Sequence, residues 1–243
     1  MLFRSDLIEE LLIWGRENGD VSSPTSILDV GCGIGGATLH LADKFNATAT
    51  GITLSPVQAR RATERAAEAG LTEGVNFLVA DALELPFADR SFDLVWSLES
   101  GEHLPNKIKF LQECYRVLQP GGTFIMATWC HRPLEAPEGQ LTDEERRLLA
   151  EIYRVYALPY IISLPEYEAI ALDVGFQNLR IADWSQAVAP FWDRVIESAW
   201  EPKAILGLLA SGWTTIEAAL SMGLMSEGYG RGLIKFGLLR GSK

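Results

Sequence analysis

Four glycines and one acidic residue lie within eight positions near the start of the chain. The segment Asp29 to Gly36 reads Asp-Val-Gly-Cys-Gly-Ile-Gly-Gly and overlaps the end of a short apolar run. Glycines at a turn between a strand and a helix let the backbone approach a ligand, and the helix N-terminus points into the same crevice. Gly31, Gly33 and Gly36 also satisfy the G-x-G-x-x-G pattern of dinucleotide-binding folds. The segment predicts a nucleotide-containing ligand, and a turn that only allows tight packing is the alternative.

A nicotinamide cofactor fits this turn poorly. Dinucleotide-binding folds place an acidic residue about twenty positions further on, at the end of the second strand, to hold the ribose. This chain has Thr53 there, and no tyrosine is followed four residues later by a lysine. An oxidoreductase therefore stays as a lesser alternative.

Three ionisable residues, Glu99, Glu102 and His103, follow an apolar run that ends at Leu98. Folds of this kind bind ligands at the carboxyl edge of the sheet, and histidine titrates near neutral pH. We therefore expect His103 to be the general base, with the two glutamates as further candidates. His131 follows the next strand at the same edge and is a second choice. The alternative is that Glu102 and His103 only cap the turn.

Helical and strand patterns alternate from residue 1 to about residue 130, which is typical of a parallel sheet covered on both faces. Beyond this point we expect helices near 142–157 and 165–174, a strand near 177–183 and a last, antiparallel strand near 232–240. The apolar segment 186–231 is too long for a hairpin loop and predicts an inserted helical cover. The expected strands of the first part are Ser26 to Val30, Ala47 to Ile52, Val75 to Val79, Phe92 to Leu98 and Thr123 to Thr128.

One helix start has an especially clear signal. Ser55 supplies an N-cap, Pro56 a proline at the first helical position, and Gln58, three residues after the N-cap, the partner of a capping box. The sequence therefore predicts a helix from this point to about Gly70.

The composition limits the classes of partner. The 32 acidic against 21 basic residues give a net charge of −11, which disfavours a nucleic-acid substrate. Cys32, Cys114 and Cys130 are odd in number and follow no secretory signal, so we expect free thiols in a reducing, cytoplasmic setting. No apolar run is long enough to span a membrane, and contact with a membrane surface stays open. The sequence predicts no metal site and leaves the oligomeric state open.

The segment Asp29 to Gly36 resembles motif I of the class I methyltransferases that use S-adenosylmethionine (SAM). Asp81-Ala82 after the third strand and Pro120-Gly121-Gly122 before the fifth are similar to later signals of the same family. The resemblance implies a Rossmann-like, mainly parallel seven-stranded α/β sheet, with SAM at the glycine turn, Asp29 orienting its amino group and Asp81 beside the adenine. The residues implied to contact SAM are Asp29, Gly31, Cys32, Gly33, Gly35, Thr53, Gln58, Asp81, Ala82, Ser97 and Leu98.

Longer strings resemble the gamma-tocopherol methyltransferases of cyanobacteria and plants. They are Trp96 to His103, Thr128 to Arg132, Asp183 to Ser185, Val188 to Trp192 and Gly232 to Gly237. This resemblance implies carbon methylation of a chromanol, from gamma- to alpha- and from delta- to beta-tocopherol, and a plastid location if the source is a plant. Relatives in the same clade methylate amine nitrogens, so an N-methyltransferase is the main alternative.

The resemblance also implies a division of labour within one domain, 1–243. Residues 1–130 would bind SAM and residues 131–243 the acceptor. His131, Phe191, Trp192, Leu209 and Trp213 are the expected acceptor residues. The last two belong to a helical stripe with Ile216 and Leu220, which is either core or a wall of the acceptor cavity. The family carries a further N-terminal stretch that helps close the SAM site, so we expect this chain's site to be open to solvent.

Overall fold

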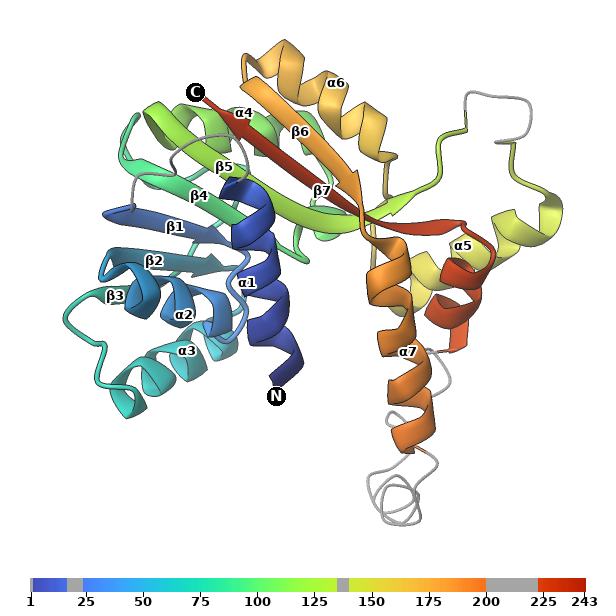
Figure 1. The fold of residues 1–243 in the computed structure, drawn as a ribbon, viewed down its shortest axis with the longest axis horizontal. Coiled ribbons are helices and arrows are strands. Elements are labelled where there is room, and N and C mark those ends of the chain that lie inside the picture. Colours follow the sequence, from blue (N-terminus) through green and yellow to red (C-terminus); the bar gives the residue numbers. More distant parts are fainter. Residues whose placement is uncertain (1, 17–23, 135–139, 200–222) are drawn as a thin grey trace.

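The fold is known from a computed structural model, which describes residues 2–16, 24–134, 140–199 and 223–243 (Figure 1). The described residues form a seven-stranded sheet in the order β3-β2-β1-β4-β5-β7-β6. The strands are β1 Ser26–Val30, β2 Thr48–Thr53, β3 Val75–Val79, β4 Phe92–Leu98, β5 Leu118–His131, β6 Gln177–Asp183 and β7 Ile234–Ser242. The helices are α1 Leu2–Arg16, α2 Gly36–Phe45, α3 Pro56–Glu68, η1 Gly101–His103, α4 Lys107–Val117, α5 Asp143–Val155, α6 Leu164–Val174 and α7 Ser185–Ala199.

The predicted α/β architecture is confirmed. Strands β1 to β5 run parallel, and β7 is antiparallel to both β5 and β6. The order of the strands reverses at β1: β2 and β3 follow on one side of it, and β4 and β5 on the other. Such a switch point opens a crevice at the carboxyl edge of the sheet, where folds of this class bind ligands. The sheet order therefore places the glycine turn after β1 next to the turn after β4.

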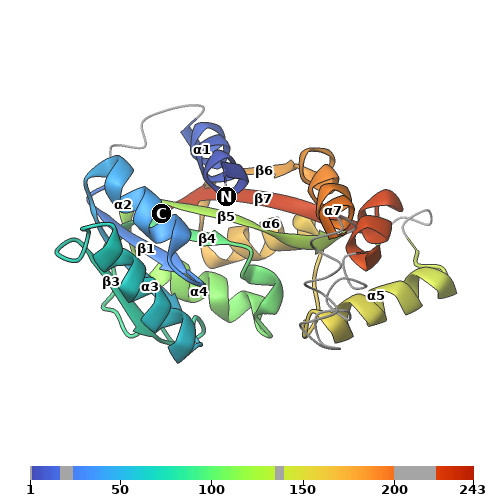
Figure 2. The same ribbon diagram turned by 90° about the horizontal axis from the view of Figure 1, so that it is seen from below.

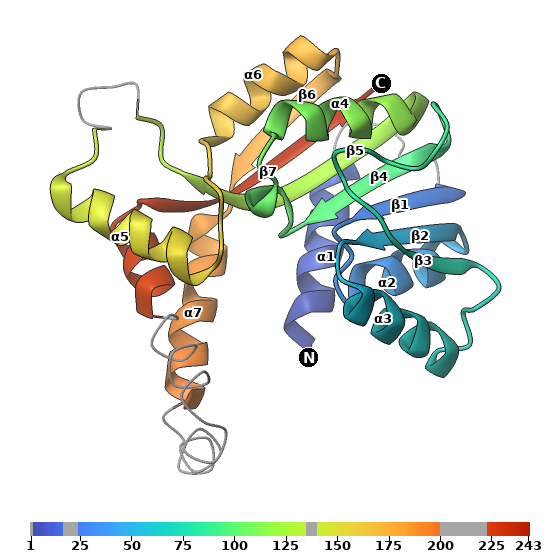
Figure 3. The ribbon, with the colours of Figure 1, turned by 180° about the vertical axis from the view of Figure 1, so that it is seen from behind.

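Helices cover both faces of the sheet, as the apolar strands require. Figure 3 shows α4 and α6 packed on the near face, with α1 on the far one. Two separate apolar clusters correspond to these faces. Along β5 the odd-numbered Ile125, Ala127 and Trp129 belong to one cluster, and the even-numbered Phe124 and Met126 to the other. This alternation follows from the two-residue period of a strand.

Strand β5 is longer than the sequence suggests. It begins at Leu118, directly after α4, instead of at Thr123, because Leu118 already pairs with Phe92 of β4. The register then shifts before Leu94 pairs with Thr123, and Gly121 has a positive φ of 79° in between. The Pro-Gly-Gly turn is thus an irregularity within a strand and not a break before it.

The predicted capping box of α3 is only half formed. The Ser55 hydroxyl accepts a hydrogen bond from the Gln58 amide at 3.3 Å, as expected of an N-cap. The Gln58 side chain does not return to the Ser55 amide, which donates instead to the Thr53 hydroxyl at 3.2 Å. Thr53 in turn donates to the Gln58 side chain at 2.8 Å. The end of β2 is therefore tied to the start of α3 by a polar pair.

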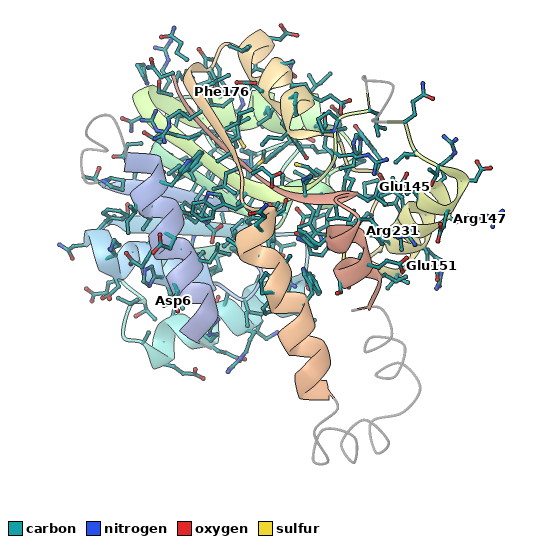
Figure 4. The ribbon with its side chains drawn as sticks, turned by 45° about the vertical axis from the view of Figure 1, so that its right-hand side comes forward. Asp6, Glu145, Arg147, Glu151, Phe176 and Arg231 are labelled. Carbon is teal, nitrogen blue, oxygen red and sulfur yellow. The ribbon has the colours of Figure 1, made fainter. Side chains whose placement is uncertain are left out.

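The second half of the chain builds a cover beyond the end of the sheet. Figure 2 shows α5, α7 and the helical residues 223–230 gathered on one side, away from α2 and α3. Arg231, which Figure 4 labels beside α5, pairs with Glu144 at 2.7 Å, and Arg132 pairs with Glu145 at 2.6 Å. Helix α7 confirms a helical start to the insertion expected at 186–231, whose residues 200–222 lie outside the described part. No described helix has the length and apolarity needed to cross a membrane.

Candidate active site

A cavity of about 480 Å³ opens at the carboxyl ends of β1, β2 and β4. It is bounded by the glycine turn on one side and by the turn after β4 on the other. Its lining residues are Ile8, Asp29, Val30, Gly31, Cys32, Gly33, Ile34, Gly36, Ala37, Ile52, Thr53, Leu54, Gln58, Ala80, Ala82, Leu98, Glu99, Ser100, His103 and Leu104. The structure thus brings most of the predicted cofactor residues, together with Glu99 and His103, to one cavity.

The glycine turn needs its glycines for two different reasons. Gly31 has a φ of +85°, and a Cβ there would lie 2.3 Å from the Cβ of Ser100. Gly33 has a φ of +55°, but a Cβ there would meet nothing within 4 Å. Gly31 therefore allows the close approach of two turns, whereas Gly33 leaves its backbone open toward a ligand.

Asp29 supplies a buried carboxylate at the wall of the cavity. Asp29 is only 1% exposed, and the Thr38 hydroxyl donates a hydrogen bond to its carboxylate at 2.6 Å. A buried charge of this kind needs a compensating donor or cation. The position suits the ammonium group of an amino-acid moiety such as that of SAM.

A neutral pair lines the cavity at the end of β2. Thr53 and Gln58, hydrogen-bonded to each other at 2.8 Å, both line it. Together they offer a hydroxyl and an amide, which can bind sugar hydroxyls in the absence of an acidic residue. Ala80 and Ala82 line the cavity near the end of β3 and add small apolar surfaces that suit an adenine ring. The residues present therefore fit SAM.

Three predicted cofactor residues do not line the cavity. Asp81 is exposed and accepts a hydrogen bond from the Leu83 amide at 2.8 Å, so it caps a turn. A Cβ on Gly35 would lie 2.6 Å from the Phe77 ring, so this glycine serves packing. Ser97 is buried, and its hydroxyl lies 2.7 Å from that of Ser100.

The turn after β4 brings Glu99 and His103 to the cavity wall. Glu99 has a φ of +52°, which is uncommon for a residue with a side chain, and its amide donates to the Ala127 carbonyl at 2.8 Å. Strained backbone of this kind often accompanies function. Burial and the nearby Lys107 charge lower the pKa of His103, which keeps its imidazole neutral and able to accept a proton at pH 7.

Glu102, in contrast, points away from the cavity. It is 1% exposed, and its carboxyl group accepts a hydrogen bond from Thr128 at 2.5 Å. Burial raises its pKa to about 7 despite this hydrogen bond. The turn of η1 places neighbouring side chains on opposite sides, so Glu102 belongs to the interior and His103 to the cavity.

His131 lies in a different cleft, of about 340 Å³, between β6, β7 and the start of α6. Its Nδ1 is 2.6 Å from the Arg132 carbonyl oxygen, and its Nε2 is 4.0 Å from the Glu166 carboxylate. The structure therefore separates His131 from Glu99 and His103, and it does not support His131 as a base for the same reaction.

The predicted acceptor residues of α7 lie in an aromatic cluster. The Trp192 ring lies 5.8 Å from that of Trp129 and 6.3 Å from that of Tyr156, and Phe191 extends toward solvent. Trp129 and Trp192 share one apolar cluster with Leu98, a lining residue of the cavity. Leu209 and Trp213, with the rest of their stripe, lie outside the described residues.

Ser100 and Ile8 are among the lining residues that were not anticipated. The Ser100 hydroxyl donates to the Val30 carbonyl at 2.8 Å and so joins the two turns. Ser100 lies between Glu99 and His103 in the segment Trp96 to His103, so this segment could have indicated that Ser100 belongs to the site. Ile8 reaches the cavity from α1 through packing that no local pattern reveals. No cluster of metal-ligand residues occurs in the described parts of the chain.

Comparison with known proteins agrees with this geometry. A family model described as a methyltransferase domain matches residues 28–126. A probable tocopherol O-methyltransferase, chloroplastic, from Oryza sativa subsp. japonica is 50% identical, over 96% of this chain and 65% of its own length. Ajmaline N-methyltransferase from Rauvolfia serpentina is 37% identical, over 96% of this chain and 81% of its own. The chain thus spans just under two thirds of the tocopherol relative.

A solved structure shows the same fold. Geranyl diphosphate C-methyltransferase from Streptomyces coelicolor A3(2), in complex with S-adenosyl-L-homocysteine, has a TM-score of 0.79 at 22% identity. The match covers 98% of this chain and 79% of that one. The fold and the cavity define a class I SAM-dependent methyltransferase. The chain therefore belongs to the SAM-dependent methyltransferases, and within that class it is similar to the tocopherol O-methyltransferases.

Proposed function

We propose that this protein methylates a ring carbon ortho to the phenol of a tocopherol-type chromanol, with SAM as methyl donor. The observation that carries the proposal is one cavity lined both by the glycine turn, Asp29 to Gly33, and by Glu99 and His103. The 50% identity to a protein named for tocopherol supports the acceptor class.

On the donor side, the chain supplies binding and orientation. Asp29 would hold the amino group, the open backbone at Gly33 would lie along the methionine moiety, and Thr53 with Gln58 would hold the ribose. SAM, when bound, supplies a methyl group on an electrophilic sulfonium. Because this group is already reactive, the main task of the protein is to align the acceptor with it.

On the acceptor side, carbon methylation releases one proton overall. The phenol gives up or shares this proton, which makes the ortho carbon nucleophilic. The new carbon–carbon bond forms as the sulfur–carbon bond breaks and S-adenosylhomocysteine leaves, and transfer of the ring proton to the phenol oxygen restores both the aromatic ring and the phenol. Glu99 and His103 line the cavity and can accept the phenol proton, and His103 is neutral at pH 7.

The acceptor's apolar part needs an apolar wall. Trp192 and Trp129 belong to the same apolar cluster as Leu98, which lines the cavity, and Trp192 comes from α7 of the cover. Aromatic side chains bury large areas and suit both a chroman ring and an isoprenoid chain. We place the acceptor between the cavity and this cover.

The site of methylation is the sharpest test. Purified protein is incubated with gamma-tocopherol and SAM, and the product is examined by mass spectrometry and proton NMR. Carbon methylation adds one methyl group, removes one aromatic proton signal and keeps the phenol. Loss of the phenol with the aromatic proton retained would instead show oxygen methylation, and the carbon proposal would fail.

An amine acceptor is the second candidate function, favoured by the identity to ajmaline N-methyltransferase. Parallel assays with alkaloid amines measure kcat/KM for each class. An amine that exceeds the chromanol tenfold or more would replace the proposal. In either case Gly33→Trp, which fills the open space beside the backbone, should abolish S-adenosylhomocysteine binding in calorimetry.

A tailed chromanol resides in membranes, so we also propose that the protein collects it at a membrane surface, and in a plastid if the source is a plant. The tocopherol relative is named as chloroplastic. Flotation with vesicles of plastid lipids, with and without gamma-tocopherol, measures this contact. Protein that stays entirely in the dense fraction in both cases would refute it.

A further inference from the structure

Lys107 is a buried cation at a position that disfavours one. It is the first residue of α4 and only 2% exposed. Lysine is almost never fully buried without partners, and a positive charge at a helix N-terminus is repelled by the helix dipole. Such a residue needs strong local compensation.

The compensation comes from the turn after β4. The Lys107 ammonium donates to the carbonyls of Gly101 at 2.8 Å, Glu102 at 3.1 Å and Leu104 at 2.7 Å. An ammonium group has three N–H donors, so these bonds use its full capacity. Lys107 thus binds the backbone of η1 from the inside, opposite the cavity.

Other buried groups complete this arrangement. The Tyr167 hydroxyl donates to the same Gly101 carbonyl at 3.3 Å, and Thr128 holds the Glu102 carboxyl group at 2.5 Å. The Tyr160 ring lies 4.9 Å from the ammonium nitrogen. The interior face of the turn is therefore fixed by α4, β5 and α6 together.

We propose that Lys107 is a positioning residue that holds the turn Glu99 to Leu104 against the cavity. This turn carries Glu99, Ser100 and His103, so its geometry sets where the proton acceptors lie. Without the ammonium, three buried carbonyls each lose one hydrogen bond, and among the described residues only that of Gly101 keeps the Tyr167 hydroxyl and the Leu104 amide as donors. The turn then opens so that the carbonyls reach water. The proposal extends the proposed function but can be tested without it.

The first test is hydrogen exchange of the turn in Lys107→Met. The amides of His103 and Leu104 donate to the carbonyls of Ser100 and Gly101, at 3.1 and 3.3 Å. These two amides should exchange about tenfold faster in the variant, because local opening becomes easier. No acceptor is needed, so the outcome does not depend on which molecule is methylated.

Lys109→Met is the matched control. Lys109 lies one half-turn further along α4, is 46% exposed and pairs with Glu113 at 3.3 Å. This variant removes the same charge from the same helix without touching the turn, so exchange and turnover should stay at wild-type values.

Lys107→Met should lower kcat about tenfold or more with the preferred acceptor, since the rate falls steeply when catalytic groups are misplaced.

The second test is the pH profile. Burial lowers the pKa of Lys107 to about 8, against the opposing effect of Glu102. Above this pH only two donors serve three carbonyls, so wild-type kcat should fall, whereas Lys107→Arg stays charged and should lack that decline. Other titratable groups that face Lys107 are His103 from the turn, Cys130 from β5, Tyr160 before α6 and Tyr167 within it.

The two tests give clear outcomes. Faster exchange confined to the turn, or an alkaline decline absent only from Lys107→Arg, supports the proposal. If Lys107→Met does not fold, the pH comparison of wild type with Lys107→Arg decides alone. Unchanged exchange in a folded Lys107→Met would overturn it. If that variant does not fold, the same decline in wild type and Lys107→Arg would overturn it.

Discussion

Replacing Gly31 by alanine should show how much the close contact between the glycine turn and the turn after β4 contributes to the stability of the fold. A Cβ at this position would lie 2.3 Å from the Cβ and 2.6 Å from the Oγ of Ser100. Ser100 cannot retreat freely, because its hydroxyl donates to the Val30 carbonyl at 2.8 Å and contacts the Ser97 hydroxyl at 2.7 Å. The substitution therefore forces the glycine turn and the turn after β4 apart.

The expected cost has two parts. A left-handed backbone costs an alanine about 1–2 kcal/mol, and overpacking a tight contact costs about 1–3 kcal/mol more. Gly31→Ala should lose about 2–5 kcal/mol of unfolding free energy in total. Gly33→Ala has the same kind of backbone, with a φ of +55°, but meets nothing within 4 Å, so only the first part applies.

Chemical denaturation measures the free energy of unfolding of both variants. Calorimetry with S-adenosylhomocysteine measures whether the cavity still binds this ligand. Ser100→Gly in the Gly31→Ala background removes the contacting atoms and should recover most of the overpacking cost. A double-mutant cycle isolates this coupling. Equal stability losses in Gly31→Ala and Gly33→Ala, or no recovery in the double variant, would refute the steric reasoning.

Three further outcomes follow from the same structure. His103→Ala should lower turnover by about 10² or more while S-adenosylhomocysteine affinity stays within a few-fold, and a joint collapse of both would place His103 in the cofactor site. Removing the isoprenoid tail from gamma-tocopherol should lower kcat/KM over a hundredfold, since four buried methylenes contribute roughly 3 kcal/mol, and an equal kcat/KM would contradict an apolar tail site. The Arg116 guanidinium lowers the pKa of the Glu113 carboxyl group to about 2, so its contribution to stability is complete above about pH 4.5 and is lost as the pH falls toward 2. Glu113→Gln should therefore be less stable than wild type at pH 7 and nearly equal near pH 2 in thermal unfolding, and a pH-independent difference would exclude this linkage.

The sequence alone specified the sheet and the glycine turn that lines the cavity. Five parallel strands and their antiparallel edge were readable from apolar runs and turn residues, because those patterns repeat with the period of the backbone itself. The glycine turn was equally readable, since a positive φ and a close approach both require glycine at fixed positions such as Gly31 and Gly33.

The tertiary structure decided which side chains face the cavity. Glu102 and His103 are adjacent in sequence, yet one contacts Thr128 in the interior and the other lines the cavity. The positive φ of Glu99 and the single 3₁₀ turn of η1 that follows it set the directions of the two side chains. No periodic sequence pattern covers so short a segment. His131 lies in another cleft because the end of β5 pairs with β7, and its side chain lies beside the start of α6.

Long-range packing decided the rest. Ile8 and Lys107 have no local signal for their roles, since one reaches the cavity from α1 and the other binds carbonyls of a preceding turn from its interior side. Both positions depend on how separate elements pack, which spacing along the chain does not encode. The sequence therefore determined where the ligand-binding edge lies, and only the folded chain determined which groups meet there, because hydrogen bonds and contacts between distant segments fix side-chain direction.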